Sequence, residues 1–480
     1  MTRPSRAVSM FALLLPFAAA LGGGWASLDA RPAFEDVRPD VADRTGRTVQ
    51  WHTGTEADAA VAAEVREMLS EPLTVGRAVQ AALLNNPRLQ GTYERLGVAQ
   101  ANLVQAGLLR NPVFDAEVKF LDTVPGTKAV LEMAVVQDFM DTLMIPLRKR
   151  LAEAELEAAK AEVTGAVLDL AAEVRVALVS LQAAARTLTM RQEVLQATDA
   201  SYDAARRLHE AGNITDLALA GERALHEEAK LAVADAETAV LEAREQMNAL
   251  MGLWGDDTGW TAADRLPDVP DEPMDLSDLE RRAVAASVDL TVLRNRMRVV
   301  AARTGIDTTE LVFPELAGGA AAEYEGPEDA WQVGPAVAVG VPVFDWGQAR
   351  TAAGRHRLRR LWHAYTAQAI EVRAAARAAR ARLRNARRQS EYYRRVVLPL
   401  AEQITAETQL QYNAMQLGVF HLLQAKRREI EVRRRYILAR RDYWIARTEL
   451  EQILAGRMLR GTAVPVSGRM PAREAAGGGH

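Results

Sequence analysis

The chain has 480 residues, a formal net charge of −4 and no cysteine. The near-neutral charge argues against a general nucleic-acid binder. The lack of cysteine excludes disulfides, thiol catalysis, iron–sulfur clusters and the lipidated cysteine of a bacterial lipoprotein. Alanine, leucine, arginine and glutamate dominate, and aromatic residues make up only 5% of the chain, which favours long helices over an aromatic-rich core.

The first residues, 1–26, resemble a secretory signal peptide. Arg3 and Arg6 supply positive charge, Met10–Ala20 is an apolar stretch of signal length, and the cleavage point is expected after Ala26 or Ala30. A buried N-terminal helix is the alternative. No later window holds about 18 uninterrupted apolar residues, so we expect no transmembrane helix. An exported chain that crosses a membrane must then do so with strands.

Composition divides the rest of the chain into two similar segments. Residues 27–72 are polar and lack a sustained period, which indicates an extended or loosely helical leader. Residues 253–273 hold prolines among Gly and Asp, which is typical of a linker, and the Gly/Pro/Arg-rich residues 457–480 indicate a disordered tail. Between them, 73–252 and 274–456 have the same order of parts, so we interpret them as two structural repeats.

Each repeat is predicted to contain a helix, two strands, a very long helix and a return helix. The first helices are expected at Leu73–Leu109 and Leu276–Thr309. The long helices are expected at Arg148–Ala211 and Gln348–Leu417, which would extend about 96 and 105 Å at 1.5 Å per residue. The first long helix has apolar residues at intervals of three and four, as in a coiled coil. Pro399 is expected to bend the second long helix locally.

Four short runs are predicted as strands, at about 113–121, 128–139, 311–324 and 331–343. Apolar residues alternate with polar or small residues along these runs. Strands of about 9–11 residues with one apolar face suit a membrane β-barrel. Two soluble hairpins packed on a helical body are the alternative, and the runs alone leave both open. Because four strands cannot close a barrel, membrane-spanning strands would need several chains, and three copies would supply twelve strands.

The stretch Val333–Gly347 (VGPAVAVGVPVFDWG) resembles the last strand of the TolC family of outer membrane efflux proteins where that strand enters the long helix. The first helix around Leu73–Leu89 and the residues Leu422–Ala425 after the second hairpin tip also resemble that family, and the resemblance covers residues 73–456. It implies a mainly α fold with a small β part. In this fold, three copies form a 12-stranded outer-membrane β-barrel that is continued by a periplasmic α-helical coiled-coil barrel.

The resemblance also implies a function. The protein would be a non-lipidated outer-membrane exit duct of a tripartite efflux pump, with a long periplasmic extension and no cofactor. Its partners would be two further copies of the chain, a periplasmic adaptor protein, an inner-membrane pump of the RND type and outer-membrane lipid, but no nucleic acid. The stretch Phe139–Arg150 and the first hairpin tip most resemble the heavy-metal branch, so heavy-metal ions are the expected cargo. A non-conducting periplasmic coiled-coil scaffold that bridges envelope partners is the alternative.

The tips of the two helical hairpins, near 212–216 and 415–420, are the predicted functional site. Gly212 and Gly418 are suited to the left-handed position that ends a helix. The resemblance implies that the tips contact the adaptor. The tip residues are Gly212, Asn213, Ile214, Thr215, Leu417, Gly418 and Val419.

Members of the family often close the periplasmic end with aspartates a few residues past the tip glycine. The first tip of this chain keeps Asp216, although the N-cap of the return helix is the stronger interpretation of this residue. The second tip has no acid there, and Gln424 and Arg427 occupy the region. Asp216, Gln424 and Arg427 are therefore the candidate gate residues.

No pattern in the sequence predicts catalysis or a metal site. The seven histidines lack the spacing of metal ligands, and there is no phosphate-binding loop or nucleophile elbow. We therefore expect no enzyme. Residues 350–399 hold 14 arginines against Glu371 and Glu391. We expect these arginines to pair with the glutamate-rich helices of the first repeat or of a neighbouring subunit. The group Arg357–Arg360 is alternatively placed near the strand end, where anionic headgroups are available.

Overall fold

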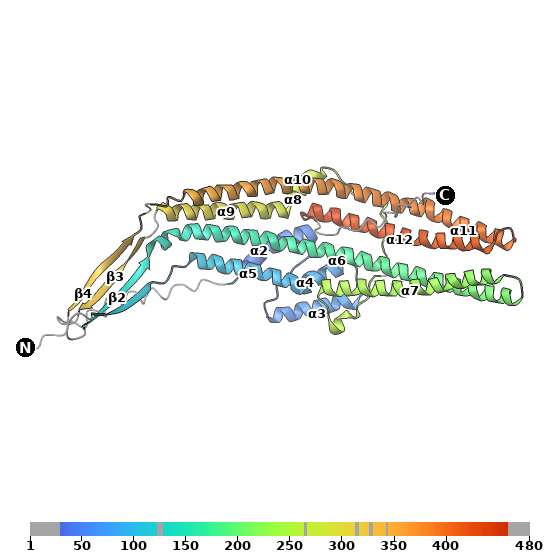
Figure 1. Cartoon of the computed structure of the whole chain (residues 1–480), viewed down its shortest axis with the longest axis horizontal. Coiled ribbons are helices and arrows are strands. Elements are labelled where there is room, and N and C mark those ends of the chain that lie inside the picture. The colour runs from blue at the N-terminus through green and yellow to red at the C-terminus, as the bar shows by residue number, and fades with distance from the viewer. Residues whose placement is uncertain are drawn as a thin grey trace, which may run out of the picture. The chain divides into compact units, whose positions relative to one another are not determined.

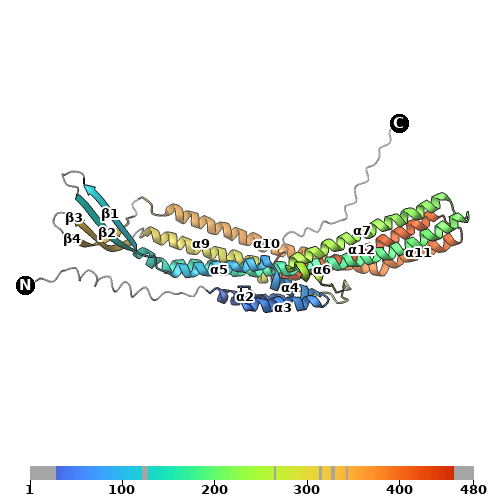
Figure 2. The ribbon, with the colours of Figure 1, turned by 90° about the horizontal axis from the view of Figure 1, so that it is seen from below.

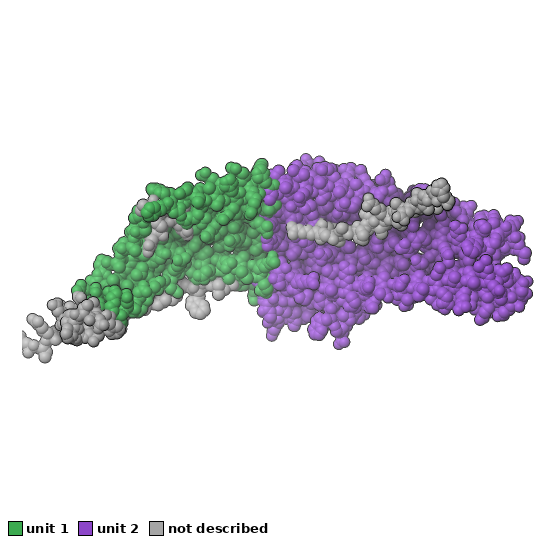
Figure 3. All heavy atoms as spheres, viewed as in Figure 1, with its two compact units in different colours: residues 1–36, 93–160, 293–363 green, residues 37–92, 161–292, 364–480 purple. Residues whose placement is uncertain are grey.

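The computed structural model describes residues 29–121, 128–263, 266–312, 316–325, 330–341 and 344–458. The expected signal peptide and the tail from residue 459 onward lie outside these residues. The chain divides into two compact units (Figure 3). Unit 1 comprises Met1–Asp36, Tyr93–Lys160 and Leu293–His363. Unit 2 comprises Val37–Thr92, Ala161–Val292 and Ala364–His480. Among the described residues, no helix combines the length and the apolar character needed to span a membrane.

Unit 1 contains one antiparallel sheet whose four strands follow chain order (Figure 1). The strands are β1 (Val113–Leu121), β2 (Lys128–Asp138), β3 (Leu316–Glu325) and β4 (Ala330–Val339). The predicted bounds of β1 and β2 agree with these to within one residue. The third prediction began five residues too early, because residues 311 and 312 still belong to the preceding helix. The fourth prediction ran past the end of β4 at Val339.

The helices of unit 1 pack through small apolar clusters. Met140 and Met144, near the start of α6 (Phe139–Glu210), are buried with Ile306 of α9 (Val288–Val312). Ala33 of α2 (Arg31–Thr45) is buried with Ala99 of α5 (Pro87–Gly107) and Leu156 of α6. The first cluster also contacts Leu316 at the start of β3, so it connects the helices to the sheet.

The leader and the linker are more ordered than the sequence analysis predicted. The leader forms α2 and α3 (Glu56–Ser70), and α3 begins with a capping box made by Thr55 and Asp58. In the linker, Trp260 is buried and its Nε1 donates to Asn248 at 2.8 Å. The Arg244 guanidinium lies 4.4 Å from the centroid of the same indole ring. Burial of a few apolar side chains therefore orders segments that lack a hydrophobic period.

The first helix of each repeat is broken, which corrects the prediction of single helices. Repeat 1 has α4 (Val75–Asn85) and α5, and repeat 2 has α8 (Leu279–Ala286) and α9. Pro87 has no backbone N–H to donate, and the Asn86 side chain caps α5 by accepting from the Leu89 N–H at 3.0 Å. Ser287 has the same role in repeat 2, where its hydroxyl accepts from the Leu290 N–H.

Both breaks contact the glycine that ends the return helix of their own repeat. The return helices are α7 (Asp216–Met251) and α12 (Val419–Ala455), and they end at Gly252 and Gly456 with positive φ values of 68° and 107°. Asn85 donates its amide to the Gly252 carbonyl at 3.0 Å. Val288 donates its N–H to the Gly456 carbonyl at 2.8 Å. A Cβ on Gly456 would lie only 2.1 Å from the Ala286 carbonyl oxygen, so no other residue fits this junction.

The second long helix begins at Gln348 as predicted, but the first begins at Phe139, nine residues before the predicted Arg148. Helix α6 has 72 residues. The second long helix consists of α10 (Gln348–Tyr392), one π-helical turn (Tyr393–Val397) and α11 (Leu398–Asn413). The irregular turn lies directly before Pro399, which lacks the N–H that an α-helix needs and whose ring clashes with the previous turn. In unit 2, α7 lies antiparallel to α6 and α12 lies antiparallel to α11, so two hairpins form (Figures 1 and 2).

Candidate functional site

The sheet separates apolar from polar side chains. Directly paired residues lie on the same face, so the pairs Phe114–Val135 and Val118–Leu131 belong to one face. Large side chains of this face are exposed. They are Phe114, Val118, Val135, Trp331, Val333, Val337 and Val339. On the other face, one row crosses all four strands in register. It consists of Glu117, Glu132, Glu323 and Gln332. Lys119 donates to Glu132 at 2.6 Å beside this row.

The first hairpin tip has the geometry that its glycine predicts. Gly212 follows the end of α6 with a φ of +74°, and its N–H donates to the His209 carbonyl at 2.8 Å. Thr215 then caps α7, because its hydroxyl accepts from the Ala218 N–H at 3.2 Å. Asp216 is therefore not the N-cap, which corrects that interpretation. Its exposed carboxylate lies 2.6 Å from the His209 Nε2 across the turn.

The second hairpin tip corrects the prediction for Gly418. Helix α11 ends at Asn413, four residues earlier than expected, so the left-handed position falls on Met415, with a φ of +58°. Gly418 has a φ of −75° and is the residue before α12, which begins at Val419. The Met415 side chain is 94% exposed and that of Phe420 is 71% exposed. Large apolar residues at an otherwise polar helix end indicate a contact surface, so Met415 and Phe420 could have been identified from the sequence as tip residues.

Of the candidate gate residues, Arg427 joins the two hairpins. Its guanidinium lies 3.0 Å from the carboxylate of Glu228, so the ion pair connects α12 with α7. Beside it, the Lys426 amine lies 3.4 Å from the Ser201 hydroxyl, which donates to the buried carboxylate of Glu222 at 2.7 Å. Gln424, in contrast, is exposed, and its side chain forms no hydrogen bond with any residue of the described segments. Partners such as Glu228 are about 200 positions away, so spacing alone could not find them.

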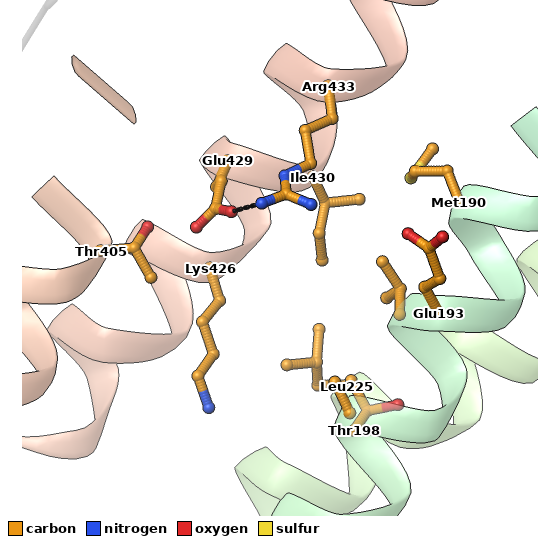
Figure 4. A pocket seen from close by; sticks show the side chains of 11 residues that line it. Met190, Glu193, Thr198, Leu225, Thr405, Lys426, Glu429, Ile430 and Arg433 are labelled. Atoms are coloured by element: carbon orange, nitrogen blue, oxygen red, sulfur yellow. Dashed lines mark ion pairs between the residues drawn. The ribbon is translucent and has the colours of Figure 1, made fainter. Parts of the chain in front are cut away.

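A cavity of about 310 Å³ lies between the same two hairpins (Figure 4). It is lined by Met190, Glu193, Val194, Ala197, Thr198, Leu225, Thr405, Lys426, Glu429, Ile430 and Arg433. Arg433 forms an ion pair with Glu429 at 2.8 Å within α12, so this pair does not bridge the hairpins. Protein interiors are normally close-packed. The cavity therefore interrupts the packing between the hairpins, although Met190 of α6 and Ile430 of α12 at its edge belong to a common apolar cluster.

Several arginines of α12 form ion pairs with glutamates one turn away on the same helix. Arg434 donates two hydrogen bonds to Glu431, and Arg435 donates a third. These bonds, with that to Arg434 the largest effect, lower the pKa of Glu431 to about 2. Three arginines of α10 pair in the same way within their own repeat, with Glu280, Glu449 and Glu391. These three arginines therefore do not pair with the first repeat, so that expectation is wrong for them.

Residues 135–253 match the family model described as outer membrane efflux protein. The expected family resemblance is confirmed. The match runs from β2 through the first hairpin to the residue after Gly252. Among the described residues, no group of three or more histidine, aspartate or glutamate side chains lies close enough together to hold a metal ion.

Solved structures of outer-membrane channels have the same fold. A membrane protein from Pseudomonas aeruginosa is 17% identical, with a TM-score of 0.68, and the match covers 82% of this chain and 92% of that one. The MtrE outer membrane channel of Neisseria gonorrhoeae is 16% identical, with a TM-score of 0.65 and coverage of 81% and 91%. The outer-membrane channel OprN is 18% identical, with a TM-score of 0.64 and coverage of 81% and 91%. No curated protein sequence matches the chain.

The similarity to outer membrane efflux proteins extends beyond the segment matched by the family model. The structural matches cover about four fifths of the chain, so the second repeat shares the fold although its sequence lies outside residues 135–253. The mainly helical fold with a small antiparallel sheet is therefore confirmed.

Proposed function

We propose that the protein is the outer-membrane exit duct of a tripartite efflux pump. The observation that carries this proposal is the exposed apolar face of the sheet, on a fold shared with outer-membrane channels. β1 and β4 are the outer strands of the sheet, and outer strands have unpaired backbone groups that lipid cannot satisfy. Pairing between copies removes both edges. Three copies then give a closed 12-stranded barrel, and their helices continue it as a coiled-coil barrel.

The opposite face of the sheet would line the lumen. Its row of Glu117, Glu132, Glu323 and Gln332 is polar and fits contact with water. A duct moves its cargo by diffusion and needs neither a catalytic residue nor a cofactor, so we propose that the protein is not an enzyme. Heavy-metal ions remain the predicted cargo, on the sequence resemblance of Phe139–Arg150 and the first tip.

The hairpin tips would be the end that meets the periplasmic adaptor, which in turn connects to an inner-membrane pump of the RND type. The exposed apolar side chains of Leu217, Met415 and Phe420 at the tips support this proposal, because water-exposed apolar groups of this size favour contact with a partner. The tip residues predicted from the sequence lie beside them. The Arg427–Glu228 pair would hold the hairpins together in the closed state, and the cavity between them would let the tips separate when the duct opens.

Fractionation and bilayer recording of the full-length protein test the proposal together. We expect trimers in the outer-membrane fraction that dissociate on heating, and steady ion conductance after the purified protein is added to a planar bilayer. A monomer in the periplasmic fraction that never conducts would instead support the alternative, a coiled-coil scaffold that bridges envelope partners.

A further inference from the structure

The two repeats share an order of exposed side chains where the sheet passes into each long helix. In repeat 1, the exposed Phe139 directly follows β2, and the exposed Lys149 and Arg150 come about ten residues later. In repeat 2, the exposed Phe344 and Trp346 follow β4, and four exposed arginines come about ten residues later. We name these four the arginine cluster. It consists of Arg355, Arg357, Arg359 and Arg360.

The arginine cluster has no acidic partner within the described segments. No ion pair joins any of its four side chains to a residue there, and neither do Lys149 and Arg150 form one. Arg350, just before the cluster, pairs with Asp345 at 2.9 Å, and the next acid along α10 is Glu371. Farther along the same helix only some arginines pair, with Glu280, Glu449 and Glu391. The cluster differs from these in its density, because it places four arginines within six residues next to the sheet.

Packing covers one side of α10 and leaves the cluster exposed. A Cβ on Gly354 would lie 2.5 Å from the Thr304 hydroxyl, so α9 closely covers that side of α10. At about 100° per residue, Arg355 and Arg359 lie about 100° and 140° around the helix from Gly354 in one direction, and the other two arginines lie about 60° and 120° in the opposite direction. The exposed Trp362 is on the side of Arg355 and Arg359. All four arginines are exposed, so the cluster flanks the covered side of α10 and is not covered by its own subunit.

The distance from the start of α10 suits a membrane surface. The cluster begins about 10 Å and ends about 18 Å along the helix from Gln348. The headgroup layer adds roughly 5–7 Å to each side of the hydrocarbon core, and its charge acts over a Debye length of about 8 Å beyond that. With α10 beginning at the edge of the core, this zone of about 13–15 Å includes the backbone of Arg355 and Arg357, and the side chains of Arg359 and Arg360 need to extend toward the sheet to enter it. Aromatic side chains followed by basic ones are the order found at membrane–water interfaces.

We infer that the arginine cluster, together with Lys149 and Arg150, binds the anionic headgroups of phospholipids in the leaflet on the helical side of the sheet. This inference rests on the proposed function, because it requires the strands to be in a membrane. Guanidinium groups hydrogen-bond phosphate oxygens in pairs, which suits a phosphate diester headgroup. The surface would hold the duct at a fixed depth and select anionic over zwitterionic lipid around it.

The test measures the lipid preference of the full-length trimer. Wild-type protein is reconstituted into phosphatidylcholine vesicles that contain brominated phosphatidylglycerol or brominated phosphatidylcholine, and quenching of tryptophan fluorescence gives the relative binding of each lipid. We expect a several-fold preference for phosphatidylglycerol. A quadruple variant, R355Q/R357Q/R359Q/R360Q, should lower the preference to about one. The control variant R281Q/R377Q/R382Q/R435Q removes equal charge from exposed arginines that have glutamate or aspartate partners, and it should keep the preference.

Three results would overturn the inference. These are equal quenching by both lipids in the wild type, an equal loss of preference in the control variant, and loss of the trimer in the cluster variant alone. The last result would mean that the arginines contact a neighbouring copy. Bilayer conductance separates this inference from the proposed function. Wild-type protein that conducts but has no lipid preference refutes only the inference, whereas protein that never inserts refutes the proposed function.

Discussion

At the scale of single residues, Arg457 is the side chain whose role differs most from its predicted one. The sequence analysis placed it in a disordered tail, because the residues after it are rich in Gly, Pro and Arg. Its guanidinium instead lies between two carboxylates of unit 2, 2.8 Å from Asp169 and 2.5 Å from Asp289. The Asp289 side chain is 8% exposed. One arginine therefore ties the end of α12 to α6 and to the start of α9.

Replacing Arg457 tests this role. In Arg457→Met, two carboxylates lose their shared cation, and one of them is buried. We expect the free energy of unfolding to fall by about 3 kcal/mol. The measurement is urea unfolding of the detergent-solubilised protein, followed by circular dichroism. Arg435→Met removes an exposed arginine from a pair with Glu431 and should cost less than about 1 kcal/mol. Equal losses in the two variants would contradict the assigned role.

Glu431 provides a test by pH. Its pKa is lowered from 4.5 to about 2, chiefly by hydrogen bonds from Arg434. A lowered pKa means that its contribution to stability is complete above pH 4.5 and is lost as the pH falls toward 2. Because the Glu431 side chain is 38% exposed, we expect the loss to be about 1 kcal/mol after solvent screening. Urea unfolding at pH 6 and pH 3 should reveal it in the wild type. Glu431→Gln should change less between the two pH values, and an unchanged difference would disprove this origin.

At the scale of elements, side-chain patterns located the strands and the first tip, but they could not supply contacts distant in sequence. Strict alternation placed β1 at its observed bounds, and Gly212 has the predicted left-handed conformation. The broken first helix was readable from Asn86–Pro87, because the residue before proline disfavours the helix. Met415 in a left-handed conformation was not readable, since propensity assigns that position to glycine. Glu228 became a partner of Arg427 only through the packing of the two hairpins.

The hairpins carry the prediction for gating. Arg427→Ala removes the ion pair between α12 and α7, and three copies would lose three pairs. At about 0.5 kcal/mol for each exposed pair, the closed state loses about 1.5 kcal/mol, so the open fraction should rise about tenfold. Single-channel recording in planar bilayers measures this fraction. Glu228→Ala should have the same effect, and the double variant should add little to either single change.

Asp216→Ala is the matched comparison at the first tip. Asp216 contacts His209 of its own hairpin rather than the second hairpin. If a ring of Asp216 carboxylates narrows the duct, as the sequence analysis predicts, its removal should raise single-channel conductance without changing the open fraction. Unchanged recordings would exclude Asp216 from the gate. An increase in the open fraction with Asp216→Ala, but not with Arg427→Ala, would place the gate at the first tip instead.

At the scale of the whole molecule, the proposed assembly requires the two faces of the sheet to meet different surroundings. Val337 is 73% exposed on the apolar face, where neighbouring copies would leave it against lipid. An arginine on the lipid face of a barrel costs about 2–4 kcal/mol near the middle of the bilayer, and a trimer bears this cost three times. Gln332 is exposed on the other face, in the row with Glu323, and an arginine there would meet water and a carboxylate.

Val337→Arg should therefore lower the amount of heat-dissociable trimer in the outer membrane at least tenfold, while Gln332→Arg should leave it within about twofold of the wild type. Immunoblots of unheated outer-membrane fractions measure both. Both variants introduce an arginine into the same strand, so a general effect on β4 would lower both equally. Such an equal loss would contradict the assignment of the apolar face to lipid. Loss confined to Gln332→Arg would mean that the face with the glutamate row, and not the valine face, meets the membrane.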